Sequence, residues 1–259
     1  MEFKNRHSLG QNFLDNSLII NNIFNSVNVS NGDVVIEIGP GLGYLTTELK
    51  KYNVKLLAFE IDERTKPYLN KLVDDKTTII YKDFMQVDLN EYVDKTTPIH
   101  IIANIPYYIT TPIIEHIIGM NLNVLDMTLM VQEEVADRLS SLPGNKEYGY
   151  ITAYLNYFYK ITKLFKVNRN NFNPVPNVDS AVIQLSKRNR VNKVKNELDL
   201  SNFIKDSFQF KRKNLRNNLK NYDLDKITEI LKNYNLDLNS RAEDISIDVF
   251  IEIINKITD

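Results

Sequence analysis

A tetrapeptide that combines an amide, a proline and an aromatic ring, Asn104-Ile105-Pro106-Tyr107, directly follows the apolar run at residues 99–103. The Asn104 side-chain oxygen and a neighbouring backbone carbonyl can both accept hydrogen bonds from an exocyclic amine, while Pro106 fixes the turn and Tyr107 provides a ring for stacking. Such stacking contributes about 1–3 kcal/mol per base, which helps to hold a base that has been taken out of its helix. The alternative is an ordinary strand-to-helix turn with proline near the helix start. The four residues together favour a nucleobase site.

A glycine-rich loop precedes this motif in the chain. Gly39, Gly41 and Gly43 stand at alternate positions just before a helix-like stretch, and Glu37 comes before them. Glycines let the backbone approach a ligand closely, both in dinucleotide sites and in S-adenosylmethionine sites. A dinucleotide loop has the spacing G-x-G-x-x-G and holds a pyrophosphate, whereas the spacing here is G-x-G-x-G behind an acid. A carboxylate beside the loop suits a cationic sulfonium and amine, so we expect S-adenosylmethionine.

Two further acidic residues follow apolar runs. Glu60 is placed to accept hydrogen bonds from both ribose hydroxyls of the cofactor, and Asp83 to accept from its adenine amine. Each carboxylate taken alone is equally well explained as a helix cap or a turn residue. Taken with the glycines and Asn104, they predict a cofactor site.

The polar ends of four apolar runs recur at nearly constant spacing. Glu37, Glu60, Asp83 and Asn104 are separated by 23, 23 and 21 residues, and helix-like stretches such as 44–50 and 64–73 lie between the runs. Strands alternating with helices predict an α/β fold with a parallel, doubly wound sheet, a Rossmann-like arrangement. Ligands bind at the carboxyl ends of the strands in such sheets, which places the four polar residues at one rim.

The second half of the chain predicts the end of this sheet and a different domain. A fifth apolar run at 127–131 leads into an amphipathic helix at 132–139, and the aromatic-rich stretch 148–159 is better explained by core packing than by a cofactor role. Two closing strands are expected at 160–167 and 180–185. From about residue 188 the composition becomes charged, Asn-rich and helical. We therefore expect a catalytic domain at 1–188 and a small all-α domain at 189–259.

Composition limits the chemistry. The chain has 259 residues, 43% hydrophobic and 25% charged, with no apolar stretch near the roughly 18 residues of a membrane span and no apolar signal region, so we expect a soluble, cytoplasmic protein. It has no cysteine and only three dispersed histidines, which argues against a metal site. A cofactor, carboxylates and amides must then supply the chemistry. No feature predicts more than a monomer.

The net charge of −1 hides a local excess of basic residues. Between Lys205 and Lys220 there are six basic residues and one acid. Such a run is most often a solvated helix face, but it is also what a phosphate-binding surface requires.

With these motifs the chain resembles a known family, the KsgA-type small-subunit rRNA adenine dimethyltransferases, which are close relatives of the Erm rRNA methylases. The resemblance covers nearly the whole sequence through these segments: residues 7–14, the glycine loop, 104–107, 131–136, 172–180, 210–219 and 241–243. It implies transfer of methyl groups from S-adenosylmethionine to N6 of two adjacent adenosines, two methyl groups each, in the 3′-terminal hairpin of small-subunit rRNA during ribosome assembly. The partner would be rRNA in an immature small subunit.

The resemblance also implies roles for individual residues. The cofactor contacts would be Asn12, Leu14, Gly39, Glu60, Asp83 and Asn104. The target adenine would be held by Asn104, Tyr107 and Phe172, although the sequence alone favours a hydrophobic plug at the base of a loop as the explanation of Phe172. RNA binding would fall to Lys211, Arg212, Lys213 and Arg216. Tyr108 departs from the Asn or Gln often found at that position in the family.

Three other functions are considered. An Erm-type methylase would act on large-subunit rRNA, but residues 210–219 and 241–243 resemble the small-subunit branch. A protein-glutamine or DNA-adenine methylase is expected to carry two prolines before the tyrosine, and the first of these positions is Ile105 here. An assembly factor would bind immature small subunits without needing methylation.

Overall fold

The structure is a computed structural model, and it describes residues 12–14 and 16–258. Contacts divide the chain into two compact units. Unit 1 comprises residues 1–136 and 162–187, and unit 2 comprises residues 137–161 and 188–259. Within the described residues, no helix is both long and apolar enough to span a bilayer.

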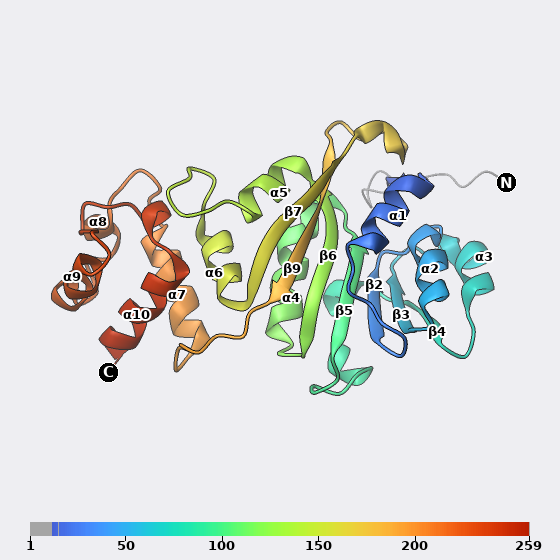
Figure 1. The fold of residues 1–259 in the computed structure, drawn as a ribbon, viewed down its shortest axis with the longest axis horizontal. Coiled ribbons are helices and arrows are strands. Elements are labelled where there is room, and N and C mark those ends of the chain that lie inside the picture. Colours follow the sequence, from blue (N-terminus) through green and yellow to red (C-terminus); the bar gives the residue numbers. More distant parts are fainter. Residues whose placement is uncertain (1–11, 15, 259) are drawn as a thin grey trace. The chain divides into compact units, whose positions relative to one another are not determined.

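A mixed seven-stranded sheet is the framework of unit 1 (Figure 1). Its strands, in spatial order, are β4 Thr77–Tyr81, β3 Lys55–Glu60, β2 Val34–Ile38, β5 Ile99–Asn104, β6 Val124–Gln132, β9 Ser180–Lys187 and β7 Tyr159–Val167. Strands β4, β3, β2, β5 and β6 run parallel, and β9 pairs antiparallel with β6. A separate two-stranded ribbon joins β1 Phe13–Leu14 to β8 Phe172–Asn173.

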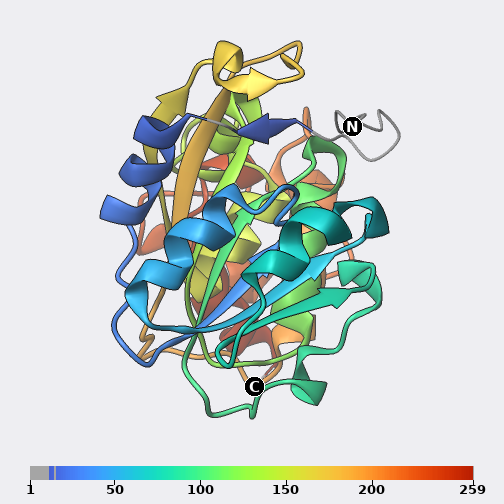
Figure 2. The same ribbon diagram turned by 90° about the vertical axis from the view of Figure 1, so that its right-hand side faces the viewer.

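The central strands are apolar on both faces because helices cover them. In β5, five of six residues are buried, as expected for a parallel strand inside a layered α/β unit. One face packs against α1 Ser17–Asn25 and α2 Tyr44–Leu49, whose Ile23 and Leu49 join Val35 and Ile102 in one core cluster. Helix α4 Thr110–Gly119 contacts the turn η5 Phe84–Gln86. The remaining elements of this region are α3 Lys66–Leu69, η2 Lys50–Tyr52, η3 Glu63–Thr65, η4 Asn70–Leu72, η6 Leu89–Glu91 and η8 Arg169–Asn171. Figure 2 shows helices α2 and α3 lying across the strands.

Unit 2 is helical. Its elements are α6 Tyr150–Phe158, α7 Glu197–Ser207, α8 Leu215–Asn218, α9 Leu224–Lys232, η9 Ala242–Asp244 and α10 Ile247–Thr258; α5 Glu133–Leu139 passes from unit 1 into it. Its core contains Tyr148, Phe203 and Phe250, each at most 2% exposed. The aromatic-rich stretch therefore packs a core, as its composition predicts.

A buried histidine joins three strands at their amino ends. His100, at the start of β5, lies 2.9 Å from Asp126 of β6 through Nδ1 and 3.3 Å from Asp33, just before β2, through Nε2. The hydrogen bond with Asp126 raises the pKa of His100 above its usual value. No spacing in the sequence marks this hydrogen-bonded cluster, because its members are far apart along the chain.

The predicted α/β class is confirmed, but one predicted element is wrong in detail. The stretch 64–73 is not one helix: it divides into η3, α3 and η4. Pro67 stands at the first turn of α3, where its missing N–H is tolerated, and it would break a helix that continued through it. The predicted division into domains 1–188 and 189–259 stays a prediction; the contact-based units differ from it by including residues 137–161 in unit 2.

Candidate active site

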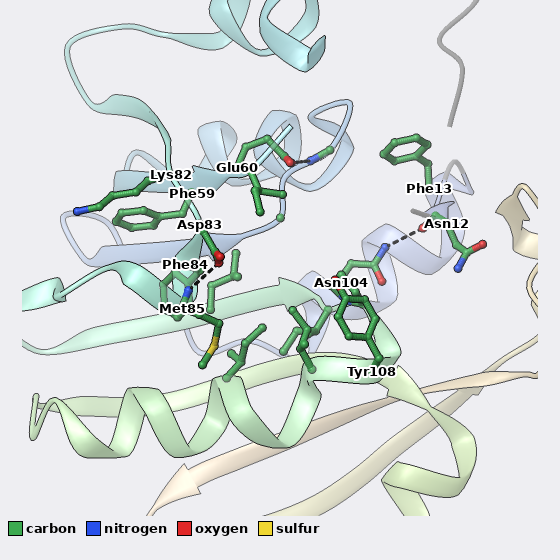
Figure 3. Close-up of a pocket in the computed structure, with 18 residues that line it drawn as sticks. Asn12, Phe13, Phe59, Glu60, Lys82, Asp83, Phe84, Met85, Asn104 and Tyr108 are labelled. Atoms are coloured by element: carbon green, nitrogen blue, oxygen red, sulfur yellow. Dashed lines mark hydrogen bonds between the residues drawn. The ribbon is translucent and has the colours of Figure 1, made fainter. Parts of the chain in front are cut away.

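A pocket of about 260 Å³ lies where strands β2, β3 and β5 end (Figure 3). Strands β2 and β5 are neighbours in the sheet although two strands separate them in sequence, so the chain order reverses between them. Such a switch point opens a crevice at the carboxyl ends of the strands. The two ends approach so closely that a Cβ at Gly39 would lie 3.7 Å from the Asn104 carbonyl oxygen.

Glu60 closes β3 and holds the glycine loop. Its Oε2 accepts a hydrogen bond from the Gly41 N–H at 2.9 Å, and its Oε1 accepts one from the Asp62 N–H at 2.8 Å. The side chain is 5% exposed, and this burial raises the pKa of Glu60, although the two backbone hydrogen bonds oppose that shift. Each carboxylate oxygen still has a second lone pair, so the group can also accept from two ligand hydroxyls.

The glycine loop could not accept larger residues at position 41. Gly41 has φ +58°, and a Cβ there would lie 2.7 Å from the ring of Phe13. Phe13 lines the pocket, so β1 brings an aromatic wall against the loop. The requirement for glycine is thus both conformational and steric.

Asp83 follows β4 and begins η5. Its Oδ1 accepts a hydrogen bond from the Met85 N–H at 3.0 Å, which is the cap that the turn-carboxylate alternative predicts. It nevertheless lines the pocket, beside Lys82. Both explanations therefore apply to the same side chain, since a carboxylate has more lone pairs than the one cap uses.

Asn104 ends β5 with a defined orientation. Its Nδ2 donates to the Asn12 carbonyl oxygen at 3.2 Å. A carbonyl can only accept, so the amine side of the amide must face Asn12, and Oδ1 remains as an acceptor. Asn12 and Asn104 both line the pocket.

Tyr107 and Tyr108 follow within η7 Tyr107–Ile109. The side chain of Tyr107 lies outside the described part of the structure. Tyr108 is 65% exposed and lines the pocket together with Asn104 (Figure 3). An exposed ring at this rim is an addition to the residues predicted for the site.

Leu14 and Phe172 lie together, apart from the pocket lining. They face each other across the β1–β8 ribbon, and each is only 3% exposed within the core cluster of unit 1. Five of the six predicted cofactor residues, all except Leu14, line the pocket. The stacking role of Phe172 stays a prediction, and its present surroundings are those of a core residue.

Glu37 differs from the carboxylate expected beside the cofactor. It is 1% exposed, its Oε2 accepts from the Thr46 hydroxyl at 2.7 Å, and its Oε1 has no hydrogen-bond partner among the described residues. Burial raises the pKa of Glu37 to about 8, with the nearby Glu60 adding to the shift. At neutral pH the group is therefore mostly a neutral acid.

The predicted RNA-binding residues belong to unit 2. Lys211, Arg212 and Lys213 lie in the turn between α7 and α8, and Arg216 lies on α8; all four are exposed. Sequence reasoning missed the pocket residues Phe13, Ile61, Lys82 and Met85. Lys82 had a signal in its position next to Asp83, and Phe13 in its position between the predicted contacts Asn12 and Leu14. Ile61 follows β3 and Met85 lies in η5, and no spacing in the sequence marks either.

The sequence matches the family described as "Ribosomal RNA adenine dimethylase" over residues 2–259. It is 41% identical to the "Ribosomal RNA small subunit methyltransferase A" of Clostridioides difficile, across 98% of this chain and 91% of that protein. It is 42% identical to the protein of the same name from Fusobacterium nucleatum, across 98% of each.

Two solved structures have a similar fold. A dimethyladenosine transferase from Plasmodium falciparum aligns with a TM-score of 0.76 at 23% identity, covering 93% of this chain and 95% of that one. The 23S rRNA methyltransferase ErmE aligns with a TM-score of 0.76 at 21% identity, covering 96% of this chain and 100% of that one. At these identities the two structures support the α/β architecture alone.

Proposed function

This chain belongs to the ribosomal RNA adenine dimethylase family, and from that premise we propose how its pocket serves the family reaction. The chain is an S-adenosylmethionine-dependent rRNA adenine N6-dimethyltransferase that acts on small-subunit rRNA. The assignment of the site rests on one observation: Asn104, whose Oδ1 accepts no hydrogen bond from another described residue, lines the pocket at the β2–β5 switch point.

The pocket residues fit S-adenosylmethionine. Among the described residues, the charged groups of the lining are two carboxylates, Glu60 and Asp83, and one ammonium, that of Lys82, whose Nζ lies 3.9 Å from the Glu91 carboxylate. This balance suits a cationic ligand without phosphates. Glu60 would hold the ribose hydroxyls, Asp83 the adenine amine, and Asn12, Gly39 and Asn104 the remaining contacts, while Leu14 supports the ribbon that carries Asn12 and Phe13.

The residues of the chain act mainly by positioning. When bound, S-adenosylmethionine supplies an electrophilic methyl group on a sulfonium. Asn104 Oδ1 and the Ile105 carbonyl would accept from the adenine amine, draw its lone pair out of the ring and aim it at the methyl group. The Pro106 carbonyl already accepts one hydrogen bond, from the Ile109 N–H at 3.2 Å, and keeps one lone pair, so we favour the Ile105 carbonyl as the second acceptor. Tyr107 and Phe172 would hold the ring, and the proton leaves to water.

The finer target is the pair of adjacent adenosines in the 3′-terminal hairpin of small-subunit rRNA, within an immature subunit. The family resemblance supports this choice over large-subunit rRNA. We place the protein in the cytoplasm, where subunits are assembled, as a monomer with Lys211, Arg212, Lys213 and Arg216 on RNA phosphates.

The test is methyl transfer from labelled S-adenosylmethionine to undermethylated small subunits, with large-subunit rRNA in parallel and the modified base mapped by mass spectrometry. Dimethyladenosine in the small-subunit hairpin is expected. If labelled methyl groups are found only in large-subunit rRNA, the chain is an Erm-type methylase. Asn104→Ala should lower kcat by about 10²-fold or more, by analogy with the loss of one electrostatic contact to a reacting group. Asn202→Ala, on the exposed face of α7, is the matched control and should not.

The assembly-factor alternative is tested in the same preparation. Glu60→Ala removes the carboxylate that accepts a hydrogen bond from the glycine loop, and it should abolish methyl transfer. If the protein were only a binding factor, wild type and Glu60→Ala would bind the particle equally well in the presence of the cofactor, and neither would transfer label to the RNA.

A further inference from the structure

The turn between α7 and α8 exposes an aromatic ring among cations. Residues 209–213 are consecutively exposed, and within them Phe210 keeps 55% of its surface in solvent. The nearby Phe208 behaves differently: it is half-buried and packs against Tyr148 and Phe250 at centroid distances of 6.3 Å each. Phe210 has no such ring contact among the described residues.

This turn, residues 209–213, is held in shape by a buried side chain. Asn218 is 8% exposed; its Nδ2 donates to the Ser207 carbonyl at 2.7 Å and to the Phe210 carbonyl at 3.4 Å, and its Oδ1 accepts from the Phe210 N–H at 3.3 Å. The Lys213 N–H also donates to the Phe210 carbonyl at 2.8 Å. The backbone of Phe210 is therefore fixed on both its donor and its acceptor side, and the exposed ring is presented from a preorganised turn.

The charges around the ring are unbalanced. Lys211, Arg212 and Lys213 directly follow Phe210, and none of the three has an ion pair in the described part of the chain. A single exposed apolar side chain needs no explanation by itself. An exposed ring on a rigid turn with three unpaired cations is the combination that single-stranded nucleic acid requires: a π-face for a base and positive charge for the adjacent phosphates.

We propose that Phe210 stacks on an unpaired base of the rRNA substrate while Lys211, Arg212 and Lys213 contact the flanking phosphates. The proposal rests on the function proposed above, because it makes the substrate RNA. It adds a docking contact in unit 2 for an unpaired nucleotide other than the methylated base.

The absence of tryptophan from the chain allows a direct test. Phe210→Trp introduces a single tryptophan at the proposed contact. Stacking on a base should quench its emission, which is excited at a wavelength that the tyrosines do not absorb. A single-stranded oligoribonucleotide should quench it, and a duplex of the same length should not. Leu198→Trp, at a site on α7 that is 64% exposed, is the matched control and should keep its emission with both RNAs. Equal quenching by single strand and duplex, or none by either, would overturn the proposal.

Binding measurements give a second, independent readout. Phe210→Ala should raise Kd for the single strand about 5- to 150-fold, the range that corresponds to loss of one base stack. Phe210→Leu keeps an apolar side chain but not the ring and should weaken binding similarly, whereas Phe210→Tyr should bind as wild type does. Because no charge is removed, the dependence of Kd on salt should not change. Wild-type affinity in Phe210→Ala, with an unchanged melting temperature, contradicts the proposal.

RNA docking and methyl transfer are measured separately. RNA binding by the Phe210 variants is measured without methyl transfer, so a failure of the proposed methylation leaves the stacking result readable. In the methylation assay on undermethylated small subunits, Phe210→Ala should raise KM for the particle and leave kcat unchanged. A loss of kcat at saturating particle would instead assign Phe210 a role in the reaction itself and would overturn its assignment as a docking contact.

Discussion

Glu37 stands directly before the glycine loop, yet it does not line the pocket. Its carboxyl group is buried with one oxygen bound by Thr46 and the other unpaired, and burial raises its pKa from 4.5 to about 8. The folded protein thus keeps a proton that the unfolded chain releases above pH 4.5. The stability that comes from this proton is complete below pH 4.5 and is lost as the pH rises toward 8.

Between pH 5.5 and 7.5 the free energy of unfolding of wild type should fall, through Glu37 alone, by up to about 1.4 kcal/mol per pH unit. Glu37→Gln has the same shape but does not titrate, so its stability should fall less steeply; urea unfolding at several pH values measures the difference. The raised pKa of His100 also lowers the stability of the protein as the pH rises above the unfolded pKa of this residue. This contribution is the same in both proteins, so it cancels from their difference. Parallel curves would mean that Glu37 is ionised in the folded state.

Single residues were predictable from sequence where their role depends on a strand end. Glu60, Asp83 and Asn104 could be placed at one rim because parallel strands present their carboxyl ends together. The ionisation state of Glu37 was not predictable from sequence, because it depends on the hydrogen bond with Thr46 and on burial under α2, and no spacing encodes either.

The β1–β8 ribbon is the element whose role most needs a test. It carries Asn12 and Phe13 toward the pocket on one side and buries Leu14 against Phe172 on the other. The ribbon joins residues more than 150 positions apart, so sequence periodicity could not reveal it, and the predicted stacking residue Phe172 appears here as part of a core.

Phe172→Ala should therefore reduce stability as well as methyl transfer. Removing a buried ring costs about 3–5 kcal/mol in the free energy of unfolding. Phe172→Leu restores most of the apolar volume, so it should recover most of the stability and, if the ring stacks on adenine, little of the activity. Val175→Ala, in the same loop and 56% exposed, is the control and should change neither. Full activity in Phe172→Leu would assign Phe172 to the core alone.

The last two strands of the sheet were predictable from their sequence pattern. The strands at 160–167 and 180–185 were expected, and the structure has β7 at Tyr159–Val167 and β9 at Ser180–Lys187. Their spatial order was not predictable: β9 lies between β6 and β7, although β7 precedes it in the chain. Alternation of apolar residues fixes which face of a strand is buried, but not which strand is its neighbour.

At the scale of the whole molecule, charge is arranged locally. The chain has a net charge of −1, so its overall field does not attract RNA. Any electrostatic attraction must come from clusters such as the basic residues at 205–220.

Neutralising Lys211, Arg212, Lys213 and Arg216 to Gln should weaken RNA binding and make it less sensitive to salt. Each lost phosphate contact should reduce the slope of log Kd against log salt by about 0.7 to 0.9, through fewer released counterions. Titrations at several salt concentrations measure the slope. Lys256→Gln, which removes a cation already paired with Glu229 at 3.3 Å, should leave the slope unchanged. If the quadruple variant has the same slope as wild type, these four residues form an ordinary solvated surface and do not bind phosphates.

The position of β9 has a consequence for how the chain is made. Strand β6 pairs with β9 along seven residue pairs, but β9 is encoded some 50 residues later, after the first segment of unit 2. During synthesis, β6 therefore waits on the ribosome with an open hydrogen-bonding edge, a surface prone to pairing with other strands. The sheet cannot be completed until residue 187 has left the ribosomal exit tunnel, so the rate of translation from the end of β6 to beyond residue 187 governs how long this edge stays unpaired.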